Sequence, residues 1–171
     1  MITLLQPAGE GRSLRSKRTV SRARRVVNHF FMPKRVLPKE AAALLSEGWT
    51  YLDVRSIPEF EDGHPAGASN VPLLHFQNGR MAPNADFKRV VEANFPKDAK
   101  IVVGCKSGGR SLQAATLMES AGYTSVVDMR GGYGGERDGF GRASVAGWAD
   151  EGLPVEKTAP PEKTYDALSK K

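Results

Sequence analysis

IVVGCKSGGRS, residues 101–111, carries the most structural information in this sequence. Its first three residues are apolar and β-branched, which predicts a short strand buried on both faces of a parallel sheet. A loop containing Cys105 and two glycines follows at once, and helix-forming residues then continue to Gly122. A buried strand that passes through a tight loop into a helix indicates an α/β protein with a parallel sheet.

The same alternation of strands and helices extends over most of the chain. Residues 39–47 are rich in helix formers and end at Gly48, and the apolar stretch 50–54 predicts the next strand. A further helix is predicted over 86–94, where apolar residues recur at helical spacing, and Val126-Val127 predicts another buried strand. We therefore predict an α/β fold with a central parallel sheet of about five short strands, flanked by helices on both faces.

The chain divides into a leader, a domain and a tail. Residues 34–156 carry the strand and helix pattern and form the predicted domain, with a glycine-rich, charged insertion at about 133–147. Residues 157–171 are rich in Pro, Lys and Glu and predict a flexible tail. Residues 1–33 are a basic leader, which we expect to be disordered. No apolar run approaches the roughly 20 residues that a membrane-spanning helix needs, so no membrane span is expected.

The net charge of +6 belongs to the N-terminal part of the chain. Residues 1–35 contain nine Lys or Arg and one acidic residue, whereas the remainder has 16 basic and 18 acidic residues. The domain itself is therefore nearly neutral, and no nucleic acid partner is expected for it. The Arg- and Ser-rich leader allows three interpretations: a targeting sequence, a disordered segment, or residues upstream of a natural start at Met32. We expect a cytoplasmic protein, or an organellar one if residues 1–31 are a transit peptide.

Cys105 is the single cysteine of the chain, which excludes an internal disulfide framework and a cysteine-rich zinc site. It directly follows a predicted strand, and open α/β sheets bind ligands at the carboxyl ends of their strands. The glycines after it let backbone amides turn toward a negative charge, and the start of a helix favours an anion there as well. We expect a thiolate or a persulfide to be stabilised by the loop that follows, which consists of Lys106, Ser107, Gly108, Gly109, Arg110 and Ser111.

Two alternatives follow from the same residues. A free cysteine at the end of a strand is often a buried packing residue, but the six residues after Cys105 contain no apolar side chain, which favours an accessible, reactive sulfur. A cysteine phosphatase or arsenate reductase would have a Cys-x5-Arg loop that wraps around a tetrahedral oxyanion. Here Arg110 gives Cys-x4-Arg, and this shorter loop suits a single sulfur atom better than a phosphate.

Further motifs occur in order between Val36 and Val155, and together with the cysteine loop they resemble those of the rhodanese family. These motifs are Asp53-Val54-Arg55, Glu59, Gly63-His64, Gly67-Ala68, Asn70, Pro72, Gly122-Tyr123, Gly131-Gly132, Trp148 and Gly152-Leu153-Pro154-Val155. The resemblance implies a rhodanese-like fold and a sulfurtransferase in which Cys105 takes a sulfane sulfur from a donor such as thiosulfate and becomes a persulfide. It implies no metal and no organic cofactor.

The partners implied by the resemblance are a small anionic sulfur donor and a thiol, cyanide-like or protein acceptor. A non-catalytic rhodanese-like module for binding or sensing is the alternative to an enzyme. Asp53 and Arg55 end the strand next to the cysteine loop, and we expect them to orient that loop. His64 has no Cys or His partner at ligand spacing, so we expect it to support the structure of its own loop rather than to bind a metal.

The insertion at 133–147 departs from the family pattern, in which the tryptophan follows Gly-Gly within a few residues. It leaves the sheet after a strand, on the same edge as Cys105. We therefore expect the insertion to border the site, with Arg137 and Arg142 as candidate contacts for an anionic donor or an acceptor protein. A solvated surface loop without a function is the alternative.

Overall fold

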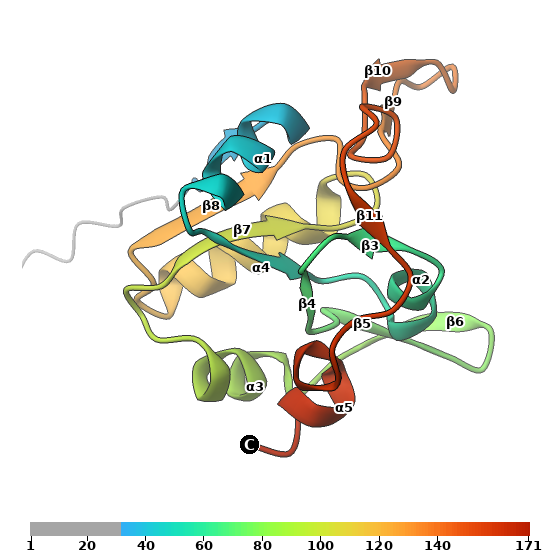
Figure 1. Cartoon of the computed structure of the whole chain (residues 1–171). Coiled ribbons are helices and arrows are strands. Elements are labelled where there is room, and N and C mark those ends of the chain that lie inside the picture. Colours follow the sequence, from blue (N-terminus) through green and yellow to red (C-terminus); the bar gives the residue numbers. More distant parts are fainter. Residues whose placement is uncertain (1–31) are drawn as a thin grey trace, which may run out of the picture.

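The computed structural model describes residues 32–171, so the three interpretations of residues 1–31 concern residues outside the described part. A five-stranded sheet forms the centre, in the order β1-β8-β7-β2-β4, and its neighbouring strands are parallel. The strands are β1 (Lys34–Val36), β2 (Thr50–Asp53), β4 (Ser69–Asn70), β7 (Lys100–Gly104) and β8 (Ser125–Met129). The predicted α/β fold with a parallel sheet is confirmed (Figure 1).

Helices cover both faces of this sheet (Figure 1). On one face, residues of α3 (Phe87–Asn94) and α4 (Gly109–Ser120) pack into a buried apolar cluster with the sheet. On the other face, α1 (Pro38–Ser46) and α2 (Ile57–Glu61) contribute to a second cluster. Each face of the sheet therefore has its own hydrophobic core, as a doubly covered parallel sheet requires.

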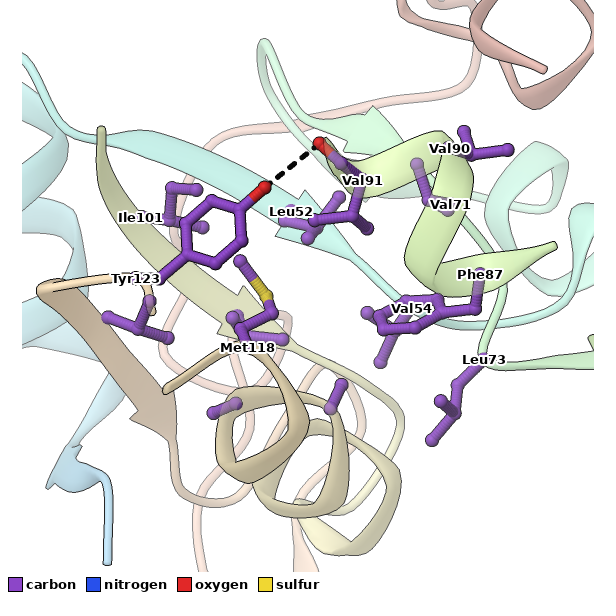
Figure 2. Close-up of a cluster of buried hydrophobic side chains, with 14 of the residues drawn as sticks. Leu52, Val54, Val71, Leu73, Phe87, Val90, Val91, Ile101, Met118 and Tyr123 are labelled. Atoms are coloured by element: carbon purple, nitrogen blue, oxygen red, sulfur yellow. Dashed lines mark hydrogen bonds between the residues drawn. The ribbon is translucent and has the colours of Figure 1, made fainter. Parts of the chain in front are cut away.

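Strand β7 explains why the first residues of IVVGCKSGGRS are all apolar. Ile101 and Val103 belong to the core shared with α3 and α4, whereas Val102 between them belongs to the opposite core. All three side chains are fully buried. Figure 2 shows Ile101 in the first core near Met118 and Tyr123, where the Tyr123 hydroxyl donates a hydrogen bond to the carbonyl of Val91 at 3.1 Å. Because successive side chains of a strand point to opposite faces of the sheet, β7 contributes to both apolar cores.

The other strands form two-stranded antiparallel pairs outside the central sheet. β3 (His64–Pro65) pairs with β11 (Val155–Glu156), which ties the end of the domain to the loop after α2. β5 (Leu74–Gln77) and β6 (Arg80–Pro83) form a hairpin. β9 (Glu136–Arg137) and β10 (Ala143–Val145) form a second hairpin within the insertion, and in Figure 1 it projects from the body of the protein.

The C-terminal segment is packed against the domain, which differs from the flexible tail expected from its composition. A 3-10 turn (Pro161–Lys163) leads into the short helix α5 (Tyr165–Leu168). Leu168 is buried in the core of α3 and α4, and its carbonyl accepts a hydrogen bond from the Asn94 side chain at 2.9 Å. The polar composition concealed this anchor because one buried leucine and a few hydrogen bonds that involve side chains hold the segment.

Candidate active site

The carboxyl ends of the parallel strands bring the predicted site residues to one edge of the sheet. Cys105 follows Gly104, the last residue of β7, and α4 begins at Gly109, as the sequence indicated. Gly108 precedes this helix with φ +95°, a conformation that glycine adopts without the steric cost of a side chain. In this conformation its backbone amide donates a hydrogen bond to Cys105 Sγ at 3.1 Å.

Cys105 is more buried than the sequence suggested. Only 2 % of the residue is exposed, and it forms part of the apolar cluster under α3 and α4. The polar side chains after it behave differently, since Lys106 and Ser107 are exposed to solvent. The expectation of an accessible sulfur was therefore wrong. Cys105 packs into the apolar cluster, and the loop turns back so that the Gly108 amide donates to its sulfur.

A second segment of backbone holds the cysteine loop from the side of β8. The Tyr133 amide donates to the Cys105 carbonyl at 2.7 Å, and the Gly134 amide donates to the Lys106 carbonyl at 2.9 Å. A Cβ atom on Gly132 would collide with the Cys105 carbonyl, so only glycine allows this close approach. The sequence motif Gly131-Gly132 marks this contact, although its role could not be deduced from the sequence.

Asp53 and Arg55 form a buried ion pair, with Arg55 Nη2 2.7 Å from Asp53 Oδ2. The same nitrogen donates to the carbonyl of Gly63 at 2.7 Å, and the guanidinium lies 4.3 Å from the centre of the Tyr133 ring. Their contact with the cysteine loop therefore runs through Tyr133, whose amide holds Cys105, rather than through a direct hydrogen bond. This arrangement is compatible with the supporting role expected for the two residues.

Arg110 is paired with Glu59 from the start of α2. Its two terminal nitrogens lie 2.7 and 2.8 Å from the two carboxylate oxygens of Glu59. Burial opposes ionisation of Glu59, but the hydrogen bonds from Arg110 and Ser56 outweigh this effect and lower the pKa of Glu59 to about 2. The sequence predicted Arg110 as a source of positive charge for the sulfur, and the structure offsets much of that charge with this carboxylate.

Ser111, at the end of the loop, lies near a pair of residues from β1 and β8, Arg35 and Asp128. Ser111 is fully buried, and its hydroxyl has no hydrogen-bond partner within the described part of the chain. Asp128 is also fully buried, and its Oδ2 accepts a hydrogen bond from Arg35 Nε at 2.7 Å. Burial raises the pKa of Asp128, and the nearby Ser111 hydroxyl and Arg35 oppose this rise. Neither Arg35 nor Asp128 was predicted as a site residue; the available signal was an aspartate inside an otherwise apolar strand, β8.

The arginines of the insertion interact within their own hairpin. Arg137 donates to the Gly141 carbonyl at 3.0 Å, and Arg142 Nε lies 3.4 Å from Asp138 Oδ2. Between residues 32 and 171, the hydrogen bonds and ion pairs of these two arginines do not reach residues 105–111. Only the base of the insertion contacts the cysteine loop, through the amides of residues 133 and 134.

His64 supports its own loop, as expected. Its Nδ1 lies 2.8 Å from the Phe60 carbonyl, and its ring stacks on that of Phe60 with 3.8 Å between centroids. Among residues 32–171, no group of three or more His, Cys, Asp or Glu side chains is arranged to hold a metal ion. Within the same residues, no helix is both long and apolar enough to cross a membrane.

Comparisons with known proteins agree with this geometry. Over 124 residues the chain is 40 % identical to thiosulfate sulfurtransferase 16, chloroplastic, from Arabidopsis thaliana, covering 72 % of this chain and 93 % of that protein. It is 36 % identical to thiosulfate sulfurtransferase 18 of the same plant, covering 68 % of this chain and 78 % of the relative. The crystal structure of Rv0390 from M. tuberculosis superposes with a TM-score of 0.63 at 25 % identity, covering 75 % of this chain and all of that one.

The family assignment rests on both sequence and fold. The sequence pattern of the rhodanese-like domain matches residues 37–135, which include the central strands β2, β4, β7 and β8 and the whole cysteine loop. Three of the motifs noted in the sequence lie at the carboxyl ends of strands that build the site: Asp53 ends β2, Cys105 follows β7, and Gly131 follows β8. This chain belongs to the rhodanese-like domain family, which includes sulfurtransferases.

Proposed function

We propose that this protein is a sulfurtransferase that moves a sulfane sulfur from an anionic donor such as thiosulfate to a thiophilic acceptor, through a persulfide on Cys105. The observation that carries the proposal is the hydrogen bond from the Gly108 amide to Cys105 Sγ, at the start of α4. An amide donor at a helix N-terminus stabilises negative charge on sulfur, which is the form of cysteine that reacts as a nucleophile.

The first half of the proposed reaction loads the enzyme. The Cys105 thiolate attacks the sulfane sulfur of thiosulfate, a new S–S bond forms, and the S–S bond of the donor breaks. Sulfite leaves with the electron pair of that bond, so the three negative charges of the reactants are divided between the persulfide and sulfite. In the second half, an acceptor nucleophile such as cyanide or a thiolate attacks the terminal sulfur, and the Cys105 thiolate is released.

Lys106 and the exposed backbone of the loop are the proposed contacts for the donor. Lys106 follows Cys105 directly and is exposed, so its charge is available to a dianion arriving from solvent. Ser107, Gly109 and Ser111 complete the proposed site. Because Arg137 and Arg142 interact within the insertion, we propose that they contact an acceptor protein rather than the small donor.

The pairing of Arg110 also supports sulfur transfer over oxyanion chemistry. A cysteine phosphatase or arsenate reductase needs its loop arginine to grip two oxygens of a bound oxyanion. Here both terminal nitrogens of Arg110 are occupied by Glu59, at 2.7 and 2.8 Å. We therefore expect no hydrolysis of an aryl phosphate by the wild-type protein.

The test is the formation of thiocyanate from thiosulfate and cyanide. The wild-type protein should catalyse it with ping-pong kinetics, and Cys105→Ser should lose the activity completely because no persulfide can form. Ser120→Ala is a matched control that alters an exposed hydroxyl at the far end of α4 and should retain most of the activity. An inactive wild-type protein would favour the non-catalytic binding or sensing module.

The cellular location is a separate part of the proposal. The composition of residues 1–31 suits a targeting sequence, and one relative carries the word chloroplastic in its name. We propose that these residues decide the location: organellar if they are cleaved, cytoplasmic if they are retained. N-terminal sequencing of the protein purified from its native cells distinguishes the two outcomes.

A further inference from the structure

Arg35 is anchored near the cysteine loop by the buried carboxylate of Asp128. It lies in β1, directly opposite Asp128 of β8 in the parallel register. Its Nε donates to Asp128 Oδ2 at 2.7 Å, and the Asp128 side chain is fully buried whereas 37 % of the Arg35 side chain is exposed. The carboxylate therefore holds one edge of the guanidinium and leaves the terminal nitrogens for other contacts.

One of those terminal nitrogens lies on the side of Gly108 where a side chain would project. A Cβ atom built on Gly108 would lie 3.2 Å from Arg35 Nη2 and 3.4 Å from the Gly131 amide nitrogen. Residue 108 is thus enclosed between the guanidinium and the backbone that follows β8. Its own amide is the donor to Cys105 Sγ, so its orientation determines whether the sulfur keeps that hydrogen bond.

The ion pairs around the site divide into two groups. Arg110 is held by Glu59, on the side of α2. Arg35 is held by Asp128, on the side of β1 and β8, and it is the charged side chain that lies next to the residue that bonds the sulfur. A planar guanidinium fixed by a buried carboxylate has little freedom to move, so it restricts the space that Gly108 beside it can occupy.

We propose that Arg35 is a positioning residue for sulfur transfer: anchored by Asp128, its guanidinium holds Gly108 so that the Gly108 amide points at Cys105 Sγ. The proposal rests on the proposed function, and it concerns how the thiolate is stabilised rather than how the donor binds. Arg35 itself does not contact the reacting sulfur; it acts through the backbone of Gly108.

The test measures ionisation of the single thiol without requiring sulfur transfer. The rate of alkylation of Cys105 by iodoacetamide is recorded against pH for the wild-type protein and for Arg35→Gln. If the Gly108 amide is released, the thiolate loses a stabilising hydrogen bond, and the midpoint of the profile should rise by about 0.5 to 1 pH unit. Persulfide loading by thiosulfate at neutral pH should slow by about three- to tenfold.

Three further variants separate positioning from stability. Arg35→Lys keeps a charge beside Asp128 but has no second nitrogen to place against Gly108, so it should restore stability without restoring the midpoint. The double variant Arg35→Gln with Asp128→Asn leaves no unpaired buried charge and should fold while showing the same shift. Arg89→Gln, which removes an exposed ion pair with Asp86, should behave as the wild type.

The proposal is overturned if folded Arg35→Gln and the double variant both keep the wild-type alkylation midpoint. It is also overturned if Arg35→Lys restores the midpoint fully, because charge alone would then be sufficient. A wild-type protein that takes no sulfur from thiosulfate would contradict the proposed function instead, and the alkylation profiles would still decide the role of Arg35.

Discussion

The hydrogen bond to the Cys105 sulfur comes from a backbone amide, that of Gly108. The nearby arginines Arg35 and Arg110 are each paired with a carboxylate. The sequence pointed to Lys106 and Arg110 as the cations nearest the sulfur. In the structure Arg110 is bound by Glu59, and the hydrogen bond to Sγ comes from the Gly108 amide. Sequence motifs identified the cysteine and the residue types around it. They could not show which arginine has a carboxylate partner, because Glu59 and Arg110 are 51 residues apart.

The Glu59–Arg110 pair predicts a pH-dependent contribution to stability. The pKa of Glu59 is about 2 in the folded protein, below its ordinary value of 4.5, so the unfolded chain binds the proton more readily. The stabilisation is therefore complete above about pH 5 and is lost as the pH falls toward 2. Glu59→Gln should lower the free energy of unfolding by about 2 kcal/mol at pH 7.

Urea unfolding of wild type and Glu59→Gln at several pH values checks this expectation. The difference between the two proteins should shrink as the pH falls from 5 toward 3. Glu92→Gln is the control, since Glu92 forms an exposed ion pair with Lys97 and its loss should matter little. A difference between wild type and Glu59→Gln that stays constant over this range would refute the assigned role of the pair.

Among the secondary-structure elements, the β9–β10 hairpin projects from the body of the protein (Figure 1). The two ends of the insertion meet, because a Cβ atom on Gly147 would collide with the Gly135 amide nitrogen and the Tyr133 carbonyl. The sequence predicted an insertion here and its origin beside the cysteine loop. It did not predict that the arginines would turn toward their own hairpin, since such contacts depend on the turn at 138–141.

Deletion of residues 136–145 should therefore shorten the loop without unfolding the domain. Circular dichroism and the thermal midpoint should change little, because Gly135 and Gly147 already lie side by side. The KM values for thiosulfate and cyanide should also stay the same, since the hydrogen bonds from the insertion to the cysteine loop come from residues 133 and 134, which the deletion keeps. A clear rise in the KM for thiosulfate would instead assign Arg137 or Arg142 to the donor site.

For the molecule as a whole, the strands β2, β7 and β8 and the helices α1, α3 and α4 followed from the sequence, whereas the attachment of the C-terminal segment did not. Apolar periodicity and glycine boundaries mark the central strands because each of these elements buries a continuous apolar face. Residues 157–171 lack such a pattern, and their docking depends on Leu168 reaching the core between α3 and α4. A single buried side chain leaves no periodic signal in the sequence.

Leu168→Ala tests whether the tail is part of the folded unit. Loss of this buried side chain should lower the free energy of unfolding by about 2 to 3 kcal/mol and the Tm by about 5 to 10 °C. Leu117→Ala, at a half-exposed position of α4, is the matched control and should change stability by less than about 0.5 kcal/mol. Equal Tm values for wild type and Leu168→Ala would mean that the segment contributes no stability in solution.

The proposal that Cys105 carries sulfur as a persulfide is tested most directly by the intact mass of the protein after incubation with thiosulfate. The wild-type chain should gain one sulfur atom, about 32 Da, and should lose it again on addition of cyanide or a thiol. Cys105→Ser should show no gain under the same conditions. An unchanged wild-type mass, or an equal gain in Cys105→Ser, would contradict the proposed mechanism.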